Sequence, residues 1–360
     1  MVKSAIKQLT PYVPEQTLAA LKAQRGLDKL VRLSANENAW GTSPKVKQAI
    51  LDWGITDVNR YPDSNVAQLR GVIADRLTID PEQLVFGDGL DEVIQLLSRT
   101  LLSPDDEVIL TQPTFSEYGL HAEIEGAKLV NVAATDTGET DLNDMLRAIT
   151  PKTQMIWLCN PNNPTGTYVT HQAIADFMTQ VPATVTVVVD EAYIDFVTAE
   201  SQASVIDLTP QFENLVVLRT FSKAYGLANF RVGYAVVAKP LARLLQTVRL
   251  PYNLSTVAEI AAVAAYQDQA FVDSVVKTVA QERAQWLNFL AELGLQFDAS
   301  QANFVFFKIN GAKQLSELLL DHGYLVRTGL GENWLRVTIG KPADNLVIQG
   351  LIKAFKKGQK

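Results

Sequence analysis

The sequence predicts an α/β fold in which a mostly parallel sheet lies between helices, followed by a smaller α+β region. Strand and helix signals alternate from Glu107 onward, as in chains that form parallel sheets. The expected strands are apolar or β-branched on both faces, which is typical of strands that helices cover on each side. They are Glu107–Leu110, Lys128–Val132, Met155–Leu158, Thr184–Val189 and Leu215–Leu218.

The alternation ends near residue 247 and divides the chain. A helix-rich segment follows at 255–293, with apolar residues at three-and-four spacing, and short strands and helices then alternate to the end. We expect an N-terminal arm at 1–35, a large domain at 36–247 and a small domain at 248–360. The small domain's expected strands are Asn303–Ile309, Tyr324–Arg327 and Trp334–Ile339, and its later helices are Ala312–His322 and Asn345–Lys356.

The composition limits the class of protein. The chain has 360 residues, of which 47% are hydrophobic and 20% charged, as in globular domains with a substantial core. Its net charge of −7 offers no basic surface for nucleic acid, so we expect no nucleic-acid partner. The three histidines are scattered along the chain, which predicts neither a bound metal nor a histidine-based triad.

The compartment is predicted from cysteine usage and from hydropathy. The single cysteine, Cys159, excludes an intramolecular disulfide and fits a reducing compartment. The first residues lack the apolar core of a signal peptide. The most apolar helical stretch, Leu254–Tyr266, is interrupted by Glu259 and is too short to cross a bilayer. We expect a cytoplasmic protein with no membrane partner.

Two polar segments near the N-terminus leave alternatives open. In the arm, Tyr12 stands between two prolines, and the residues alone favour an extended linker. The segment Leu33–Pro44 is rich in loop formers and contains Asn36-Glu37-Asn38 near a tryptophan. It is either a simple loop before a helix that starts at Ser43-Pro44, or a loop that lines a substrate site.

A turn and a glycine-containing loop follow. Tyr61 precedes a proline, which restricts its backbone and places its ring rigidly before the next helix. The sequence Phe-Gly-Asp-Gly-Leu-Asp-Glu at 86–92 joins a short strand to a helix expected at Asp91–Leu102. Its glycines permit a tight turn, and the helix start offers N–H groups to an anion. The loop is neither a dinucleotide-binding fingerprint nor a P-loop.

Groups that can bind ligands follow four of the expected strands. These groups are Pro113-Thr114-Phe115, the Asn-Pro-Asn-Asn-Pro-Thr-Gly segment at 160–166, Asp190-Glu-Ala-Tyr193, and Lys223. Open α/β sheets bind ligands outside the carboxyl ends of their strands. Each group alone is explained as a turn, a helix cap or a core residue. Their concurrence predicts one cleft.

The stretch Arg219–Gly233 carries the most specific chemistry. A nucleophilic lysine must be neutral part of the time, and burial or a nearby cation lowers its pKa. Arg231 is a candidate for that cation beside Lys223. Thr220 and Ser222 can donate hydrogen bonds to a phosphate that Arg231 would clamp. The alternative is an ordinary turn with solvated basic residues.

Two arginines lie in strands of the small domain. Arg327 and Arg336 are unusual in strands unless they have a partner. They are either exposed charges on edge strands or ligands for an anion.

Together these motifs resemble the fold-type-I pyridoxal-phosphate aminotransferases, and most closely the histidinol-phosphate aminotransferase family. The most specific matches are Thr-Phe-Ser-Lys-Ala-Tyr-Gly-Leu-Ala at 220–228 with Arg-Val-Gly-Tyr at 231–234, Asn-Pro-Asn-Asn-Pro-Thr-Gly at 160–166, and the Leu-Ser-Ala-Asn-Glu-Asn loop at 33–38. The resemblance covers nearly the whole chain in the same order. It implies a mostly parallel sheet of seven strands and pyridoxal 5′-phosphate as cofactor.

The resemblance also implies a role for each cofactor-binding residue. Lys223 would hold the cofactor as a Schiff base and then move the proton between the substrate Cα and the cofactor. Asp190 would pair with the pyridinium nitrogen and keep it protonated, so that the ring accepts electrons. Asn163 and Tyr193 would bind the phenolic oxygen. Phe115 would stack on the ring.

The remaining implied contacts concern the phosphate, the partner subunit and the substrate. The phosphate would be bound by Gly89, Leu90, Asp91, Thr220, Ser222 and Arg231. Tyr61 would reach the phosphate in a neighbouring subunit, which implies a homodimer with shared sites. Arg336, assisted by Arg327, would bind the substrate anion, and Tyr12 and Asn36 would contact the substrate.

The implied reaction transfers the amino group of L-histidinol phosphate to 2-oxoglutarate, with a pyridoxamine form between two half-reactions. An aminotransferase of the same family that acts on aromatic or other amino acids is the nearest alternative. A pyridoxal-phosphate decarboxylase of phosphorylated amino acids is a further one. A transcriptional regulator would need a longer and more basic arm, and a nicotinamide dehydrogenase would need the glycine fingerprint that is missing.

Overall fold

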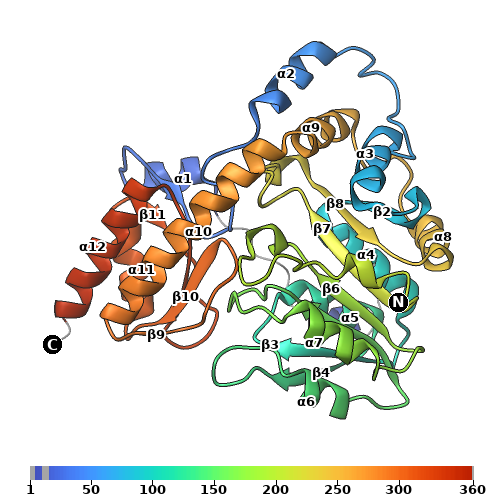
Figure 1. Cartoon of the computed structure of the whole chain (residues 1–360). Coiled ribbons are helices and arrows are strands. Elements are labelled where there is room, and N and C mark those ends of the chain that lie inside the picture. Colours follow the sequence, from blue (N-terminus) through green and yellow to red (C-terminus); the bar gives the residue numbers. More distant parts are fainter. Residues whose placement is uncertain (1–4, 10–15, 359–360) are drawn as a thin grey trace.

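A computed structural model describes residues 5–9 and 16–358 of the chain. Its main feature is a seven-stranded sheet in the order β2-β8-β7-β6-β5-β3-β4 (Figure 1). The strands are β2 (Leu84–Asp88), β3 (Glu107–Gln112), β4 (Lys128–Ala133), β5 (Thr153–Cys159), β6 (Thr186–Asp190), β7 (Leu215–Thr220) and β8 (Val232–Val236).

The direction of the strands confirms the expected architecture. Neighbouring pairs from β7 to β4 are parallel, and only β8 runs antiparallel, to β7 on one side and to β2 on the other. Strand β8 runs antiparallel to β7 because the loop that joins them is short, and a parallel neighbour would need a longer crossover connection. That loop carries Lys223 and Arg231.

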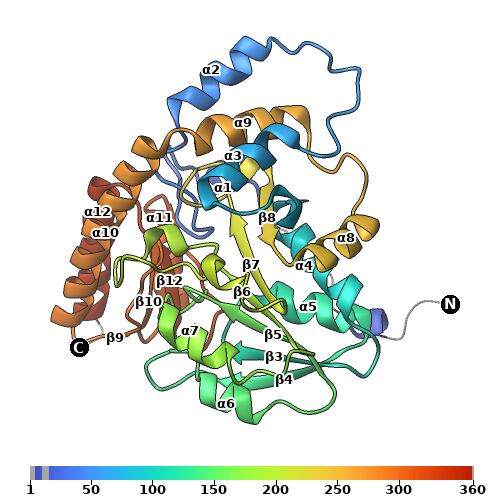
Figure 2. The same cartoon turned by 45° about the vertical axis from the view of Figure 1, so that its right-hand side comes forward.

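Both faces of the sheet are buried under helices, as the apolar strands predict. In β6, Val187 and Val189 belong to one hydrophobic core and Val188 to the other. One core includes residues of α4 (Gly89–Leu101), α5 (Ser116–Glu125) and α8 (Lys239–Val248). The opposite core includes residues of α3 (Ala67–Leu77), α6 (Leu142–Arg147), α7 (His171–Met178) and α9 (Thr256–Tyr266) (Figure 2).

A second, three-stranded sheet lies beside the first and is formed by the C-terminal third of the chain (Figure 1). Its antiparallel strands are β9 (Gln296–Phe297), β10 (Phe304–Lys308) and β12 (Trp334–Thr338). Three helices accompany it: α10 (Gln269–Glu292), α11 (Ala312–Asp321) and α12 (Pro342–Gly358). We propose that this part forms the small domain that the sequence predicts from residue 248.

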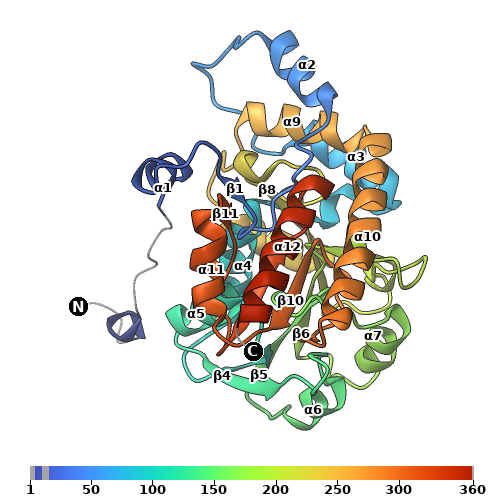
Figure 3. The same cartoon turned by 90° about the vertical axis from the view of Figure 1, so that its left-hand side faces the viewer.

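The described part of the N-terminal arm is not fully extended. It contains the helix α1 (Leu18–Gln24), capped by Thr17, whose side chain accepts a hydrogen bond from the Ala20 amide at 3.2 Å. Arg25 then pairs with Glu317 and Asp321 of α11. Figure 3 shows α1 close to α11. The short strand β1 (Val31–Arg32) pairs in parallel with β11 (Tyr324–Leu325). The expected strand Tyr324–Arg327 is therefore shorter, and it pairs with the N-terminal segment.

The helix start predicted at Ser43-Pro44 is confirmed. In α2 (Pro44–Trp53) the Ser43 hydroxyl accepts from the Lys45 amide at 3.1 Å, and Pro44 occupies the first turn.

No helix in the described part of the chain is long and apolar enough to cross a membrane. Within residues 5–9 and 16–358, no group of three or more histidine, cysteine or acidic side chains is arranged to hold a metal ion.

Candidate active site

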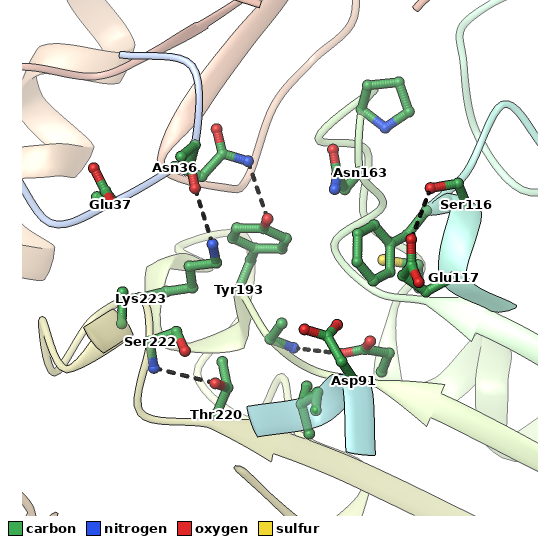
Figure 4. A pocket seen from close by; sticks show the side chains of 18 of the residues that line it. Asn36, Glu37, Asp91, Ser116, Glu117, Asn163, Tyr193, Thr220, Ser222 and Lys223 are labelled. Carbon is green, nitrogen blue, oxygen red and sulfur yellow. Dashed lines mark hydrogen bonds between the residues drawn. The ribbon is translucent and has the colours of Figure 1, made fainter. Parts of the chain in front are cut away.

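A pocket of about 600 Å³ lies at the carboxyl ends of the parallel strands and reaches to the second sheet. It brings together most of the residues that the sequence nominated (Figure 4). Those that line it are Asn36, Leu90, Asp91, Phe115, Asn163, Asp190, Tyr193, Thr220, Ser222, Lys223, Arg231, Arg327 and Arg336. The cleft predicted from four strand ends is thus present.

Lys223 follows β7 and points into this pocket. Its Nζ donates a hydrogen bond to the Ala35 carbonyl at 3.0 Å and lies 5.7 Å from the centre of the Tyr193 ring. Burial, and then the positive charge of Arg336, lower the pKa of Lys223 to about 8. Arg231, which the sequence suggested as the cation, contributes in the same direction but less than Arg336. A partly neutral lysine is therefore available close to neutral pH.

Asp190 ends β6 at the bottom of the pocket. Its Oδ1 accepts from the Ala192 amide at 3.0 Å, and its Oδ2 accepts from the Tyr118 hydroxyl at 2.7 Å. Burial raises the pKa of Asp190 to about 6, while these two donors oppose the rise. The carboxylate is thus oriented at both oxygens and stays ionised at neutral pH.

Asn36 and Tyr193 join the two sheets beside Lys223 (Figure 4). The Asn36 side chain donates to the Tyr193 hydroxyl at 3.0 Å, and its amide oxygen accepts from the Thr338 hydroxyl of β12 at 3.0 Å. Asn36 adopts a left-handed backbone (φ 57°), which asparagine tolerates better than most residues. Its carbonyl accepts from Asn303 at 3.0 Å. These contacts favour a pocket-lining loop over a simple loop.

The start of α4 forms a cradle for an anion. Gly89 has a φ of +73°, and a Cβ there would lie 2.1 Å from Nη2 of Arg231. Only glycine leaves room for the guanidinium beside this helix start. Arg231 donates to the Asp91 carboxylate at 3.0 Å, so an incoming phosphate would compete with Asp91 for it. Gly89 itself shapes the cradle without lining the pocket.

The cradle suits a phosphate group in its choice of donors. First-turn N–H groups of a helix lack partners within the helix, and they lie here near one arginine. The hydroxyl-bearing Thr220 and Ser222 line the same pocket, and each is buried. The arginine, the Ser222 hydroxyl and the helix-start amides can donate to a phosphate, whereas the Thr220 hydroxyl donates to the Val232 carbonyl at 3.4 Å and accepts from the Ser222 amide at 3.1 Å. The residues present therefore fit the phosphate of pyridoxal phosphate.

The second sheet supplies the opposite wall. Arg336 in β12 donates to the side-chain oxygen of Asn163 and, at 2.5 Å, to the Ser34 carbonyl. Arg327 and Arg336 exchange backbone hydrogen bonds of 3.0 and 2.9 Å, which holds them side by side. Both line the pocket, so the reading of exposed edge-strand charges is wrong for the buried Arg336.

Tyr61, which the resemblance assigns to the site of a neighbouring subunit, lies on the surface. Tyr61 is 82% exposed, and its ring stacks on Tyr252 at 4.7 Å between centroids. It does not line the pocket of its own chain. Tyr12 lies outside the described residues.

Further residues that line the pocket were not predicted from the sequence. Arg32 follows from the pairing of β1 with β11, and its Nη1 donates to Glu37 at 3.3 Å. A two-residue strand carries no periodic signal that would reveal it. Tyr118 of α5 lies three residues after Phe115, which directly precedes the helix, so its spacing from a predicted site residue was a usable signal.

Comparison with known proteins identifies the family. A family model described as aminotransferase class I and II matches residues 28–348. The chain belongs to this aminotransferase family. It is a pyridoxal-phosphate-dependent aminotransferase with the fold-type-I architecture that the sequence predicted.

Three individual proteins that are similar to this chain are all named histidinol-phosphate aminotransferase. The histidinol-phosphate aminotransferase of Lactiplantibacillus plantarum is 51% identical over 355 residues, which cover 99% of this chain and 100% of that protein. The enzyme of the same name from Limosilactobacillus fermentum is 46% identical over 361 residues, again covering 99% and 100%. The crystal structure of histidinol-phosphate aminotransferase from Sinorhizobium meliloti with pyridoxal-5′-phosphate has a TM-score of 0.88 and 26% identity, covering 98% and 97%.

Proposed function

We propose that this aminotransferase transfers the amino group of L-histidinol phosphate to 2-oxoglutarate, which yields imidazole acetol phosphate and L-glutamate. The observation that carries the proposal is the presence of Arg336 and Arg327 opposite Lys223 in one pocket. One substrate brings a phosphate and the other two carboxylates, and the planar arginine fork pairs with either anion. The full-length similarity to histidinol-phosphate aminotransferases supports this choice of substrate.

We infer the same residue roles that the resemblance implied for the cofactor. Pyridoxal phosphate supplies an aldehyde that condenses with amines and a ring that accepts electrons from the substrate Cα. Lys223 would hold that aldehyde, and Asp190 would hold the ring nitrogen in its protonated form. Asn163 and Tyr193 would bind the phenolic oxygen, and Phe115 would lie against the ring.

Lys223 is suited to moving a proton. With a pKa of about 8, its amine is neutral in about a tenth of molecules at pH 7, and this fraction rises steeply above it. Tyr193 is suited to donating a hydrogen bond, because burial raises the pKa of its hydroxyl to about 12 and keeps it protonated.

We further propose a homodimer in the cytoplasm, in which Tyr61 reaches the cofactor phosphate of the partner. The support is an exposed apolar face made of the last turn of α2, the loop after it and the turn after α8. It consists of Leu51, Ile55, Val58, Tyr61, Leu250 and Tyr252, each 45–82% exposed. The Tyr61–Tyr252 stack joins its two halves. Monomeric proteins rarely expose so many large apolar side chains together.

The test is a single half-reaction with the purified, cofactor-loaded enzyme. Stoichiometric L-histidinol phosphate, and separately L-phenylalanine, is added, and the absorbance of the bound cofactor is followed. Conversion by histidinol phosphate alone is the expected result, and Lys223→Ala is the control that should show none. Conversion mainly by phenylalanine would instead make the protein an aromatic aminotransferase. Release of carbon dioxide would indicate a decarboxylase.

A further inference from the structure

The carboxylate of Asp190 depends on one side-chain donor. Asp190 is 3% exposed, and its Oδ2 accepts from the Tyr118 hydroxyl at 2.7 Å. The backbone amide of Ala192 serves the other oxygen at 3.0 Å. Mutation can remove the Tyr118 donor, whereas the Ala192 amide remains in any variant.

The ring of Tyr118 is fixed in place. It is fully buried and stacks on Trp157 with 4.4 Å between centroids and 9° between planes. Its edge meets the Phe115 ring at 5.5 Å and 78°. Burial and the charge of Asp190 raise the pKa of the Tyr118 hydroxyl well above its ordinary value, so it remains a donor. Phe115, directly before α5, thus lines the pocket, and Tyr118 in the first turn of α5 donates to Asp190.

The surroundings of Asp190 otherwise disfavour its charge. Asp91 of α4 and the adjacent Glu191 both raise the pKa of Asp190 through like charge. The ionisable groups facing it from other elements are the Cys159 thiol of β5 and the hydroxyls of Tyr118 and Tyr193, which are neutral at pH 7. Burial has the largest effect, and the carboxylate retains its charge at neutral pH by a narrow margin.

We propose that Tyr118 is a positioning residue whose hydroxyl keeps Asp190 ionised and oriented toward the ring nitrogen of the cofactor. The proposal rests on the cofactor placement inferred above and adds a residue to it. A neutral Asp190 would lose the charge that keeps this nitrogen protonated. Removal of one charge-assisted hydrogen bond is sufficient to produce that loss below neutral pH.

The experiment measures cofactor binding by the apoenzyme between pH 5.5 and 9, using pyridoxal phosphate and equilibrium dialysis. Affinity for the cofactor should fall at acidic pH, and we call this fall the acidic limb. In Tyr118→Phe the pH midpoint of the acidic limb should move up by about one unit, because a hydrogen bond to a charged group contributes about that much. Affinity at pH 6 should fall about fivefold relative to wild type, with little change at pH 9. Titration of the cofactor's own phosphate is common to all proteins compared and cancels.

Two matched variants separate this role from a structural one. Tyr168→Phe removes a hydroxyl that contacts another carboxylate, Glu200, outside the pocket, and should leave the limb unchanged. Asp190→Asn should abolish the acidic limb. The double variant with Tyr118→Phe should then show the same pH dependence of affinity as Asp190→Asn alone. An equal loss at every pH, or an unmoved limb, would overturn the proposal. Neither result bears on the amino donor, so the half-reaction test of function stands apart.

Discussion

At the scale of the single residue, the main feature of this molecule is a set of charged side chains that lie away from the surface. Lys223, Asp190 and Arg336 all line one pocket, and each makes a hydrogen bond to a neighbouring protein group. Asp298 is a contrasting case outside it, since the carboxyl is 5% exposed and lies so close to Gly138 that a Cβ there would meet it at 2.6 Å. The charges in the pocket serve binding, whereas the burial of Asp298 lowers the stability of the protein.

Arg336→Ala should impair both half-reactions. The side chain is expected to bind the phosphate of one substrate and a carboxylate of the other. Loss of a charge-assisted pair costs about 2–3 kcal/mol, so each half-reaction should slow about 30- to 150-fold in kcat/KM. Single-turnover absorbance measurements with each substrate check this. Arg336→Lys should restore little, because a point charge does not replace the fork. Loss with only one substrate would show that Arg336 does not serve both anions.

Asp298→Asn should stabilise the protein at alkaline pH. Burial raises the pKa of Asp298 to about 7, above the unfolded value of 3.8. Between these values the native state retains a proton that the unfolded state releases, so stability falls as pH rises from about 4 to 7 and then stays low. The asparagine removes this penalty, on the order of 1–3 kcal/mol. Thermal unfolding should show a clear gain at pH 8 and little at pH 4.5. An equal gain at both would point to another cause.

At the scale of elements, close approach of backbones determines the site. The strand β8 packs on the start of α4, where a Cβ on Gly233 would lie 2.8 Å from the Leu90 amide nitrogen. The loop at 38–42 lies against the segment after Lys223, and a Cβ on Gly226 would meet the Gly41 carbonyl at 1.9 Å. Glycine at these points lets two elements share the cofactor site.

Gly89→Ala should weaken cofactor binding. The added Cβ requires an unfavourable φ of +73° and displaces the Arg231 guanidinium. Loss of that contact should reduce affinity about 10- to 100-fold, measured by equilibrium dialysis with pyridoxal phosphate.

The matched control for that substitution is Gly71→Ala in α3, where the new Cβ meets nothing within 4 Å. It should leave binding unchanged and stabilise the fold by about 0.5–1 kcal/mol. Similar affinities for the two variants would exclude a role of Gly89 in making room for Arg231.

At the scale of the whole molecule, the site depends on how the two sheets are joined. Arg283 of α10 is buried and donates to the carbonyls of Phe196 and Ala302 at 2.9 and 3.0 Å. It thereby links a loop beside the first sheet with the start of β10 in the second. Helices α2 and α8, which border the exposed apolar face, lie away from α12 in Figure 1.

Leu250→Glu should disrupt the proposed dimer. Leu250 is 69% exposed on that face, and a buried charge there should raise the dimer dissociation constant about tenfold or more. Sedimentation velocity over a dilution series measures the shift. The control is Leu346→Glu on α12, which is 65% exposed and away from the face, and should have no effect. Equal behaviour of the two would place the interface elsewhere.

Local patterns in the sequence determined the elements and the chemistry. The apolar strands, the Ser43-Pro44 helix start and the polar groups at strand ends depend on a few adjacent residues, so they were predictable together with Lys223 and Asp190. Tertiary structure alone decided which distant groups meet. Tyr118 reaches Asp190 across 72 positions, and Arg336 rather than Arg231 has the larger effect on Lys223, because the second sheet closes over the first. Such contacts depend on packing between elements, which leaves no periodic trace along the chain.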